Sequence, residues 1–269
     1  MSPDRLRLCR SALFLPASNP RAVEKAFSLP ADLIILDCED AVRAEDKAAA
    51  RVAAVEAFVK GFEGRLCAIR INAVGTAWHE ADLAAGRSSK ADLIVLPKAE
   101  DPHSVRAIAE AGGKPVIAMI ESARGVLASA AIARESAALM AGTNDLAADL
   151  AVPPLPKRSG LLTALQSIVI AARAAGAAAF DGVFNGLQDP DGLADESRHG
   201  RSFGFDGKSV IHPGQIEIVN RCFSPDESAI AEAERLIAAA SGGAARFEGR
   251  MIEDMHVAQA RTILAKARR

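Results

Sequence analysis

Eight short apolar runs, most of them separated by helix-length segments, constrain the fold of this chain more than any other feature. Apolar runs of this length, bounded by turn residues, are typical of buried parallel strands. Eight such strands alternating with helices predict an α/β fold, the (β/α)8 TIM barrel, whose chemistry lies at the carboxyl ends of the strands. The runs cover residues 11–16, 33–40, 66–72, 93–99, 115–122, 137–145, 180–185 and 208–213.

Composition excludes several classes of function. The 269 residues match the usual size of one such barrel, and half of them are hydrophobic. A net charge of −2 and a set of aromatic residues limited to ten Phe and one Trp argue against nucleic acid as a partner. The four cysteines form no CxxC pair, so neither a disulfide framework nor a zinc site is expected.

Membrane and export signals are also missing from the pattern. No apolar run approaches about 18 residues, the length that would span a membrane. The apolar stretch that follows the basic first ten residues is too short for a secretory signal. We therefore expect a cytoplasmic protein with no membrane association.

A Gly-rich break at residues 241–249 (SGGAARFEG) is the best candidate for a linker. It separates a barrel domain, predicted over residues 1–240, from a C-terminal linker and helical arm over residues 241–269. An amphipathic pattern predicts a final helix over residues 251–267 within this arm.

Glu121 and Asp145 stand at the ends of two consecutive strand runs. Neighbouring parallel strands bring such residues to one edge of a barrel, where two carboxylates and several waters suit Mg²⁺. The alternative is that each carboxylate caps the following helix or pairs with a cation. For two acids on neighbouring strand ends, we favour the metal site.

Arg70 ends the third run, and its guanidinium is suited to binding a substrate carboxylate through two parallel hydrogen bonds. A structural ion pair is the alternative role. Lys98 ends the fourth run and has the same two interpretations, with Asp37 or Glu39 as its structural partners.

Three acids, Asp37, Glu39 and Asp40, crowd the end of the second run. They either orient the waters of a metal, with one acting as a base of raised pKa, or form salt bridges to Arg70 and Lys98. His212, at the end of the eighth run, is a candidate base, although a structural hydrogen-bonding role is favoured. The chain has no P-loop, Rossmann or GxSxG motif.

Taken in order, several motifs resemble the citrate lyase β-subunit-like branch of the HpcH/HpaI aldolase/citrate lyase family. The resemblance covers residues 10–265, nearly the whole chain, and it is the ordered set rather than any one motif that is specific. The motifs are SALFLPASNPRAVEKA, LIILDCEDAV with Lys47 downstream, IRIN followed by GT, LIVLPKAE, IESARG, AGTNDLAADL and GKSVIHPGQI.

The resemblance implies a Mg²⁺-dependent TIM-barrel enzyme that cleaves or forms carbon–carbon bonds next to acyl thioesters. Glu121 and Asp145 would hold the metal, with Glu121 also lining the substrate site. Arg70 would bind the carboxylate of an oxo acid, and Glu39 and Asp40 would line the same pocket. The ligands would be oxo acids and thioesters of CoA or an acyl carrier protein. The family also implies a homotrimer or hexamer, with the arm lying over a neighbouring subunit.

One departure concerns the arm. Relatives that act on CoA thioesters carry an aspartate in a MID sequence, whereas RMIEDMHVAQAR places Glu253 at that position. We therefore expect a lyase acting on a citryl-, malyl- or citramalyl-type thioester, with Glu253 as a further acid–base candidate. The alternatives are an aldolase acting on free 4-hydroxy-2-oxo acids and a thioester-binding subunit with little activity.

Overall fold

The computed structural model describes residues 3–153, 156–240 and 245–267. The chain divides into two compact units, one ending at Asn220 and the other beginning at Arg221. The predicted boundary at residue 240 differs from this division, and residues 241–244, at that boundary, lie outside the described part. Each unit is described by itself below.

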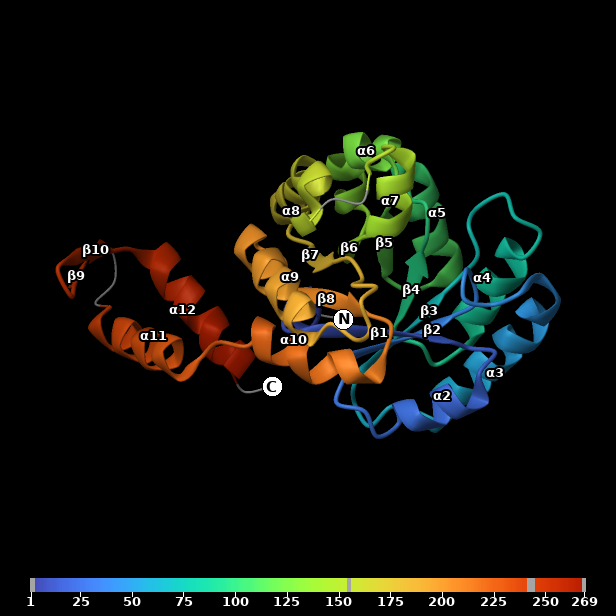
Figure 1. Cartoon of the computed structure of the whole chain (residues 1–269), viewed down its shortest axis with the longest axis horizontal. Coiled ribbons are helices and arrows are strands. Elements are labelled where there is room, and N and C mark those ends of the chain that lie inside the picture. The colour runs from blue at the N-terminus through green and yellow to red at the C-terminus, as the bar shows by residue number, and fades with distance from the viewer. Residues whose placement is uncertain (1–2, 154–155, 241–244, 268–269) are drawn as a thin grey trace. The chain divides into compact units, whose positions relative to one another are not determined.

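In the first unit, eight parallel strands of the described chain close into a barrel in sequence order (Figure 1). Each predicted run overlaps one strand, so the predicted TIM barrel is confirmed. Strands with helices on one side and the barrel core on the other are buried on both faces, which explains their nearly continuous apolar sequences. The strands are β1 (Ser11–Pro16), β2 (Leu33–Asp37), β3 (Leu66–Arg70), β4 (Leu93–Leu96), β5 (Val116–Ile120), β6 (Ala138–Ala141), β7 (Ala178–Asp181) and β8 (Gly207–Val210).

Helices connect the strands, and several begin as their sequences dictate. Pro20 and Pro102 occupy first turns, where a missing N–H is harmless, and Asn19 and Asp101 cap these helices through their side chains. The helices of this unit are α1 (Pro3–Arg7), α2 (Pro20–Ala26), α3 (Lys47–Lys60), α4 (His79–Ser88), α5 (Pro102–Gly112), α6 (Ala123–Arg134), α7 (Thr143–Asp149), α8 (Leu162–Ala175) and α9 (Pro190–Phe203), with α10 (Ile216–Phe223) crossing the division between the units.

Helix α4 was not predicted from the sequence. Its Gly86 weakens the helical pattern, but the structure gives this glycine a packing role. A Cβ atom at Gly86 would lie 3.3 Å from the side chain of Ile69 and 3.4 Å from that of Ile94. The glycine therefore lets α4 approach β3 and β4 closely.

Alternate side chains of strands β1 to β7 fill the barrel interior, including Phe14, Ile35, Ala68, Val95 and Met119. The same alternation directs the next residues toward the helices. Lys208 on β8 is fully buried on this outer side, where its Nζ contacts Asp181 of β7 at 3.1 Å and Glu196 of α9 at 2.7 Å. This ion group ties the ends of β7 and β8 to α9.

The second unit contains α11 (Glu227–Ala239), the antiparallel strands β9 (Ala245–Phe247) and β10 (Arg250–Ile252), and α12 (Asp254–Ala267). Gly249, the last residue of the Gly-rich stretch 241–249, belongs to a tight turn. Glu248 and Gly249 both have positive φ angles, 46° and 83°, as a two-residue hairpin requires. Because residues 250–252 pair in this hairpin, α12 starts three residues later than the predicted helix.

No helix in the described part of the chain has the length and apolar character needed to cross a membrane.

Candidate active site

A cavity of about 410 Å³ lies at the carboxyl ends of the barrel strands. Five of the residues proposed from the sequence line it together: Asp37, Asp40, Arg70, Glu121 and Asp145. They are distant in sequence, and the closed barrel brings them to one edge. Phe14, Met119 and Val183 add apolar wall, and Ser209 and Asn144 add further polar groups.

Arg70 is held by Asp37 through the two-pronged bond that its guanidinium favours. Its Nε donates to Asp37 Oδ1 at 2.7 Å and its Nη2 donates to Asp37 Oδ2 at 2.6 Å. Asp37 also accepts the backbone N–H groups of Glu39 and Ala41. Burial acts to lower the pKa of Arg70, but the charge of Asp37 outweighs it and raises this pKa above its usual value.

The third nitrogen of the guanidinium, Nη1, faces the other two acids of the loop after β2. It lies 3.1 Å from Glu39 Oε2 and 3.9 Å from Asp40 Oδ2. The face of the guanidinium also packs over the ring of Phe14, at 5.0 Å from its centroid. The interpretation that these acids form salt bridges is thus correct for Arg70. Of the three guanidinium nitrogens, Nη1 is the one that remains for a ligand.

Glu39 is 5% exposed, and its environment is unfavourable for a charge. Burial raises the pKa of Glu39 to about 8, and the opposing effect of Arg70 is insufficient to restore the ordinary value. Asp40, by contrast, is an exposed acid that lines the cavity.

The raised pKa of Glu39 predicts a pH-dependent stability. Folded Glu39 binds its proton more tightly than the unfolded chain does, so this stabilisation is complete below about pH 4.5 and is lost as the pH rises through about 8. Glu39→Gln removes the titration. We expect its unfolding free energy, relative to the wild type, to rise by at most about 1.4 kcal/mol per pH unit across this window.

Urea unfolding at several pH values, without added metal, measures this difference. The exposed Glu45 supplies a control, since Glu45→Gln is expected to change the unfolding free energy little at any pH. A constant difference between Glu39→Gln and the wild type would contradict the assignment.

Glu121 follows β5 and is 4% exposed. Its Oε1 accepts the backbone N–H of Lys98 at 2.6 Å. Lys98 holds a left-handed backbone with a φ of 49°, which is unusual for a non-glycine residue and is found most often at functional sites. The Lys98 side chain itself is exposed, and within the described chain neither Asp37 nor Glu39 forms an ion pair with it.

The backbone at Gly142, just after β6, makes room for the Glu121 carboxylate. A Cβ atom at this position would lie 2.4 Å from Glu121 Oε2. Asp145 follows in the first turn of α7 and is exposed at the cavity wall. The sequence predicted that Asp145 ends a strand run, whereas the structure ends β6 at Ala141 and places Asp145 on a helix.

The pair of Glu121 and Asp145 fits a magnesium site. Burial raises the pKa of Glu121 to about 7; the N–H of Lys98 opposes this shift and the charge of Asp145 adds to it. Two acids that repel each other beside a cavity are suited to a divalent cation. Among the described residues no group of three or more His, Cys, Asp or Glu forms a metal site, and Mg²⁺ often uses one or two carboxylates and retains waters.

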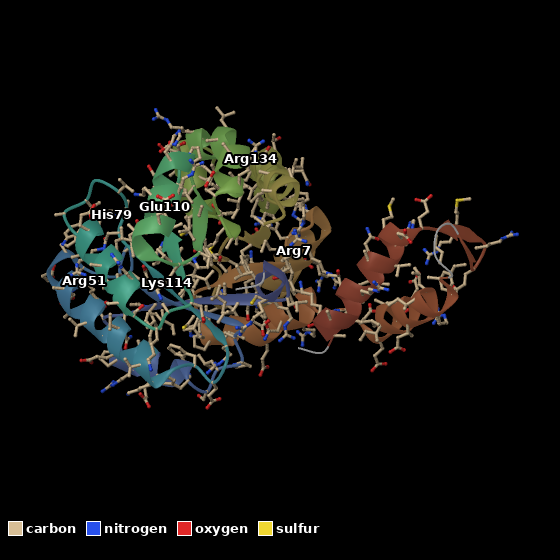
Figure 2. The ribbon with its side chains drawn as sticks, turned by 180° about the vertical axis from the view of Figure 1, so that it is seen from behind. Arg7, Arg51, His79, Glu110, Lys114 and Arg134 are labelled. Carbon is tan, nitrogen blue, oxygen red and sulfur yellow. The ribbon has the colours of Figure 1, made fainter. Side chains whose placement is uncertain are left out.

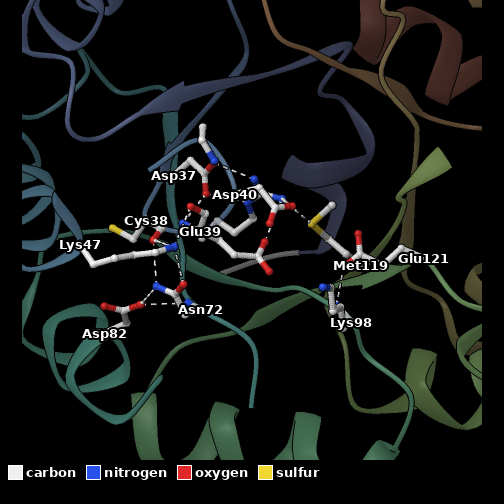
Figure 3. A network of polar contacts seen from close by, with 12 residues as sticks. Asp37, Cys38, Glu39, Asp40, Lys47, Asn72, Asp82, Lys98, Met119 and Glu121 are labelled. Atoms are coloured by element: carbon white, nitrogen blue, oxygen red, sulfur yellow. Dashed lines mark hydrogen bonds and ion pairs between the residues drawn. The ribbon is translucent and has the colours of Figure 1, made fainter. Parts of the chain in front are cut away.

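A buried network supports the loop that carries these acids (Figure 3). Lys47 of α3 donates to the backbone oxygens of Cys38 and Glu39 and to Asn72 Oδ1, at 3.0, 2.8 and 2.7 Å. Asn72 in turn donates to the oxygen of Cys38 and to Asp82 Oδ2. These contacts hold the backbone of the loop that contains Cys38 and Glu39 in place.

Helices α3 and α4 complete this network from outside the barrel. Arg51 of α3 donates to Asp82 at 2.7 Å, and His79 at the start of α4 contacts the backbone oxygen of Asn72 at 2.8 Å. Figure 2 labels Arg51 and His79 on this side of the molecule. Sequence patterns alone give Lys47 no such role, because a lysine in an amphipathic helix normally faces solvent.

Two further candidates from the sequence are His212 and Glu253. His212 accepts the backbone N–H of Gly214 through Nδ1 at 3.1 Å, which matches the structural role favoured for it. Glu253 belongs to the second unit, where its backbone N–H donates to His256 Nδ1 at 3.0 Å and its side chain is exposed.

Comparison with known families decides to which family the chain belongs. Residues 10–213 match the model described as HpcH/HpaI aldolase/citrate lyase, and residues 161–269 match one described as a C–C bond lyase of the TIM-barrel fold. The chain belongs to the HpcH/HpaI aldolase/citrate lyase family. The predicted family and the predicted enzyme class, a carbon–carbon lyase, are both confirmed.

Three relatives place the chain within the HpcH/HpaI aldolase/citrate lyase family. A (3S)-malyl-CoA thioesterase from Cereibacter sphaeroides is 42% identical over 96% of this chain and 94% of the relative. A crystal structure of CitE from Mycobacterium tuberculosis with magnesium, acetoacetate and coenzyme A has a TM-score of 0.81 at 34% identity, covering 98% of this chain and 100% of that one. A citrate lyase β subunit of the same organism with oxaloacetate and magnesium has a TM-score of 0.73 at 34% identity, covering 82% and 100%.

Proposed function

We propose that this chain is a Mg²⁺-dependent lyase that cleaves or forms a 3-hydroxy-acyl thioester of the citryl, malyl or citramalyl type. The products of cleavage are an oxo acid and an acyl thioester. The observation that carries the proposal is one cavity lined by Glu121, Asp145 and Arg70. Relatives described with magnesium, coenzyme A and oxo acids support the same ligands here.

The residues of the cavity have separate roles in this reaction. Glu121 and Asp145 would hold Mg²⁺, which would stabilise the negative charge that develops on the substrate hydroxyl oxygen as it loses its proton. Arg70 binds the carboxylate of the oxo acid through Nη1, and Asp37 keeps the guanidinium in place. Asp40, exposed at the cavity wall, takes the proton from the substrate hydroxyl as the carbon–carbon bond breaks.

The thioester enolate left by cleavage needs a proton donor. We assign this role to Glu253 of a neighbouring copy, whose arm reaches over the site in a homotrimer or hexamer. The proposal keeps the predicted division into a barrel of residues 1–240 and an arm of residues 241–269. A cytoplasmic location and a carrier that is either CoA or an acyl carrier protein belong to the same proposal.

A second candidate is hydrolysis of a malyl-type thioester. The observation that favours it is the 42% identity to a protein described as a (3S)-malyl-CoA thioesterase. Hydrolysis would add water to the thioester, leave the carbon–carbon bond intact, and release free CoA and the hydroxy acid in place of acetyl-CoA and an oxo acid.

One assay separates these candidates. The purified chain is incubated with Mg²⁺ and malyl-, citramalyl- or citryl-CoA, and both oxo acid and free thiol are measured. Oxo acid with acetyl-CoA identifies the lyase, whereas free CoA without oxo acid identifies the thioesterase. Cleavage of free 4-hydroxy-2-oxo acids would replace the thioester proposal with an aldolase. CoA binding without any turnover would indicate a binding subunit.

A further inference from the structure

Ser209 is a polar residue of β8, between Lys208 and Val210, and its side chain faces the inside of the barrel. The register pairs Ser209 with Ala12 of β1, which belongs to the barrel core. The preceding residue, Lys208, points outward to its ion group with Asp181 and Glu196. Because side chains alternate along a strand, Ser209 must point inward.

The strand residues beside Ser209 are small, and the side chain of Thr143 packs over one of them, Gly182. Ala12 lies opposite it on β1, and on β7 the pair of Asp181 and Lys208 places Gly182 opposite Ser209 one step later. Both neighbours are small. Phe14 follows Ala12 by two residues on the same face of β1, and the guanidinium of Arg70 packs over its ring.

The hydroxyl of Ser209 is uncommitted in the described chain. The residue is 2% exposed and lines the cavity, and its Oγ atom is buried without a hydrogen-bond partner among the described residues. Buried hydroxyl groups nearly always have a partner, because leaving one unpaired is unfavourable. A hydroxyl that lines a substrate cavity and bonds no protein group is therefore available to a ligand.

Arg70 alone cannot supply all the hydrogen bonds that a bound carboxylate can accept. Two of its three nitrogens are committed to Asp37, and Nη1 is shared with Glu39 and Asp40. A carboxylate in the cavity can accept about four hydrogen bonds. One nitrogen of Arg70 does not satisfy it, so a second donor is required on the cavity wall.

The depth of Ser209 decides which part of the substrate reaches it. CoA is much larger than the oxo acid, so we place the carrier at the mouth of the cavity and the oxo acid, the portion farthest from it, at the deep end. In this orientation the oxo acid, rather than the thioester carbonyl, is the part that approaches Ser209, which is 2% exposed.

We propose that Ser209 is a substrate-binding residue whose hydroxyl donates a hydrogen bond to the carboxylate of the 2-oxo acid, which it shares with Arg70 Nη1. The proposal rests on the proposed function and adds a residue to its oxo-acid site. Ser209 also limits the size of the acid, because its side chain forms part of the deep wall.

Titration calorimetry of the full-length protein with Mg²⁺ and pyruvate tests this assignment, with glyoxylate as a second ligand. We expect Ser209→Ala to raise the Kd of both acids at least tenfold, since a hydrogen bond to a charged acceptor is lost. Ser209→Thr keeps a hydroxyl and is expected to retain most of the affinity. The Kd of acetyl-CoA should change less than twofold in Ser209→Ala.

Ser197 provides a matched control. It is a fully buried serine of α9 whose hydroxyl bonds the backbone oxygen of Leu193, away from the cavity lining. Ser197→Ala should leave the Kd of pyruvate unchanged. Ser209→Cys, of similar volume but a weak donor, replaces Ser209→Ala should that variant fail to fold.

The outcomes distinguish a failure of the role proposed for Ser209 from a failure of the proposed lyase function. An unchanged Kd for both acids in Ser209→Ala, with normal binding by the wild type, would overturn the role of Ser209 and leave the lyase proposal standing. Weakened acetyl-CoA binding with unchanged 2-oxo acid binding would place the hydroxyl at the thioester and also overturn it. If the wild type binds neither acid in the presence of Mg²⁺, the proposed function falls, and the site of Ser209 with it.

Discussion

Glu121→Gln and Asp145→Asn are each expected to lower turnover of the thioester by about a thousandfold, because a metal that stabilises developing charge contributes several kcal/mol. Each substitution keeps the shape of the side chain and removes the charge that holds Mg²⁺. The affinity for Mg²⁺, measured by calorimetry or by displacement of Mn²⁺, should fall in parallel with turnover.

Asp149 gives a control on the same helix. It lies four residues after Asp145 in α7, and its carboxylate accepts the backbone N–H of Ala123. Asp149→Asn should therefore leave the affinity for Mg²⁺ unchanged. Normal metal binding by both Glu121→Gln and Asp145→Asn would place the ion elsewhere and remove the basis of the proposed reaction.

Arg70→Met should have the second large effect, on stability as well as activity. Asp37 and Glu39 are 1% and 5% exposed, and the substitution leaves both without their cationic partner. Breaking a buried ion pair by removing one partner typically costs about 3–5 kcal/mol of unfolding free energy. Arg70→Lys keeps the charge but loses the two-pronged bond, so it should fold and bind 2-oxo acids at least tenfold more weakly.

The Arg106–Glu135 pair is the matched control for stability. It has the same two-pronged geometry but lies at the surface, where the arginine side chain is 52% exposed. Arg106→Met should lower the unfolding free energy by less than about 1 kcal/mol. Equal losses in Arg70→Met and Arg106→Met, measured by urea unfolding, would contradict the importance assigned to burial.

The barrel and the position of its site follow from the sequence because of two simple physical effects. Strands buried on both faces are apolar throughout, and polar residues that end them meet at one edge of a closed barrel. Glu121, Arg70 and Asp40 could therefore be predicted to lie together. Asp145 was also found, although it lies on a helix, because that helix begins at the end of β6.

Partnerships among these residues could not be predicted in the same way. Lys98 was expected to act through its side chain, but it acts through a backbone N–H that depends on a left-handed φ angle. The pairing of Arg70 with Asp37 depends on the register of β2 and β3, which places the two residues side by side. The sequence offered the Arg70 pairing only as an alternative and did not indicate the Lys98 contact, since register and backbone angle are products of packing.

Lys47 and Ser209 could not be identified from the sequence pattern. Lys47 stands in a helical pattern whose lysines normally face solvent, and Ser209 follows Lys208 in a strand that is not apolar throughout. Each is a polar residue that the structure buries. Such conflicts between polarity and burial are expected at functional sites.

The way Arg70 is fixed has a consequence for how quickly and tightly a ligand is captured. An arginine in solution samples many rotamers, and a ligand that recruits it must first freeze them. Here Asp37 and the Phe14 ring have already immobilised the guanidinium when the chain folds. An arriving acid meets a rigid receptor, so its selectivity depends on shape and charge, with little adjustment of the protein.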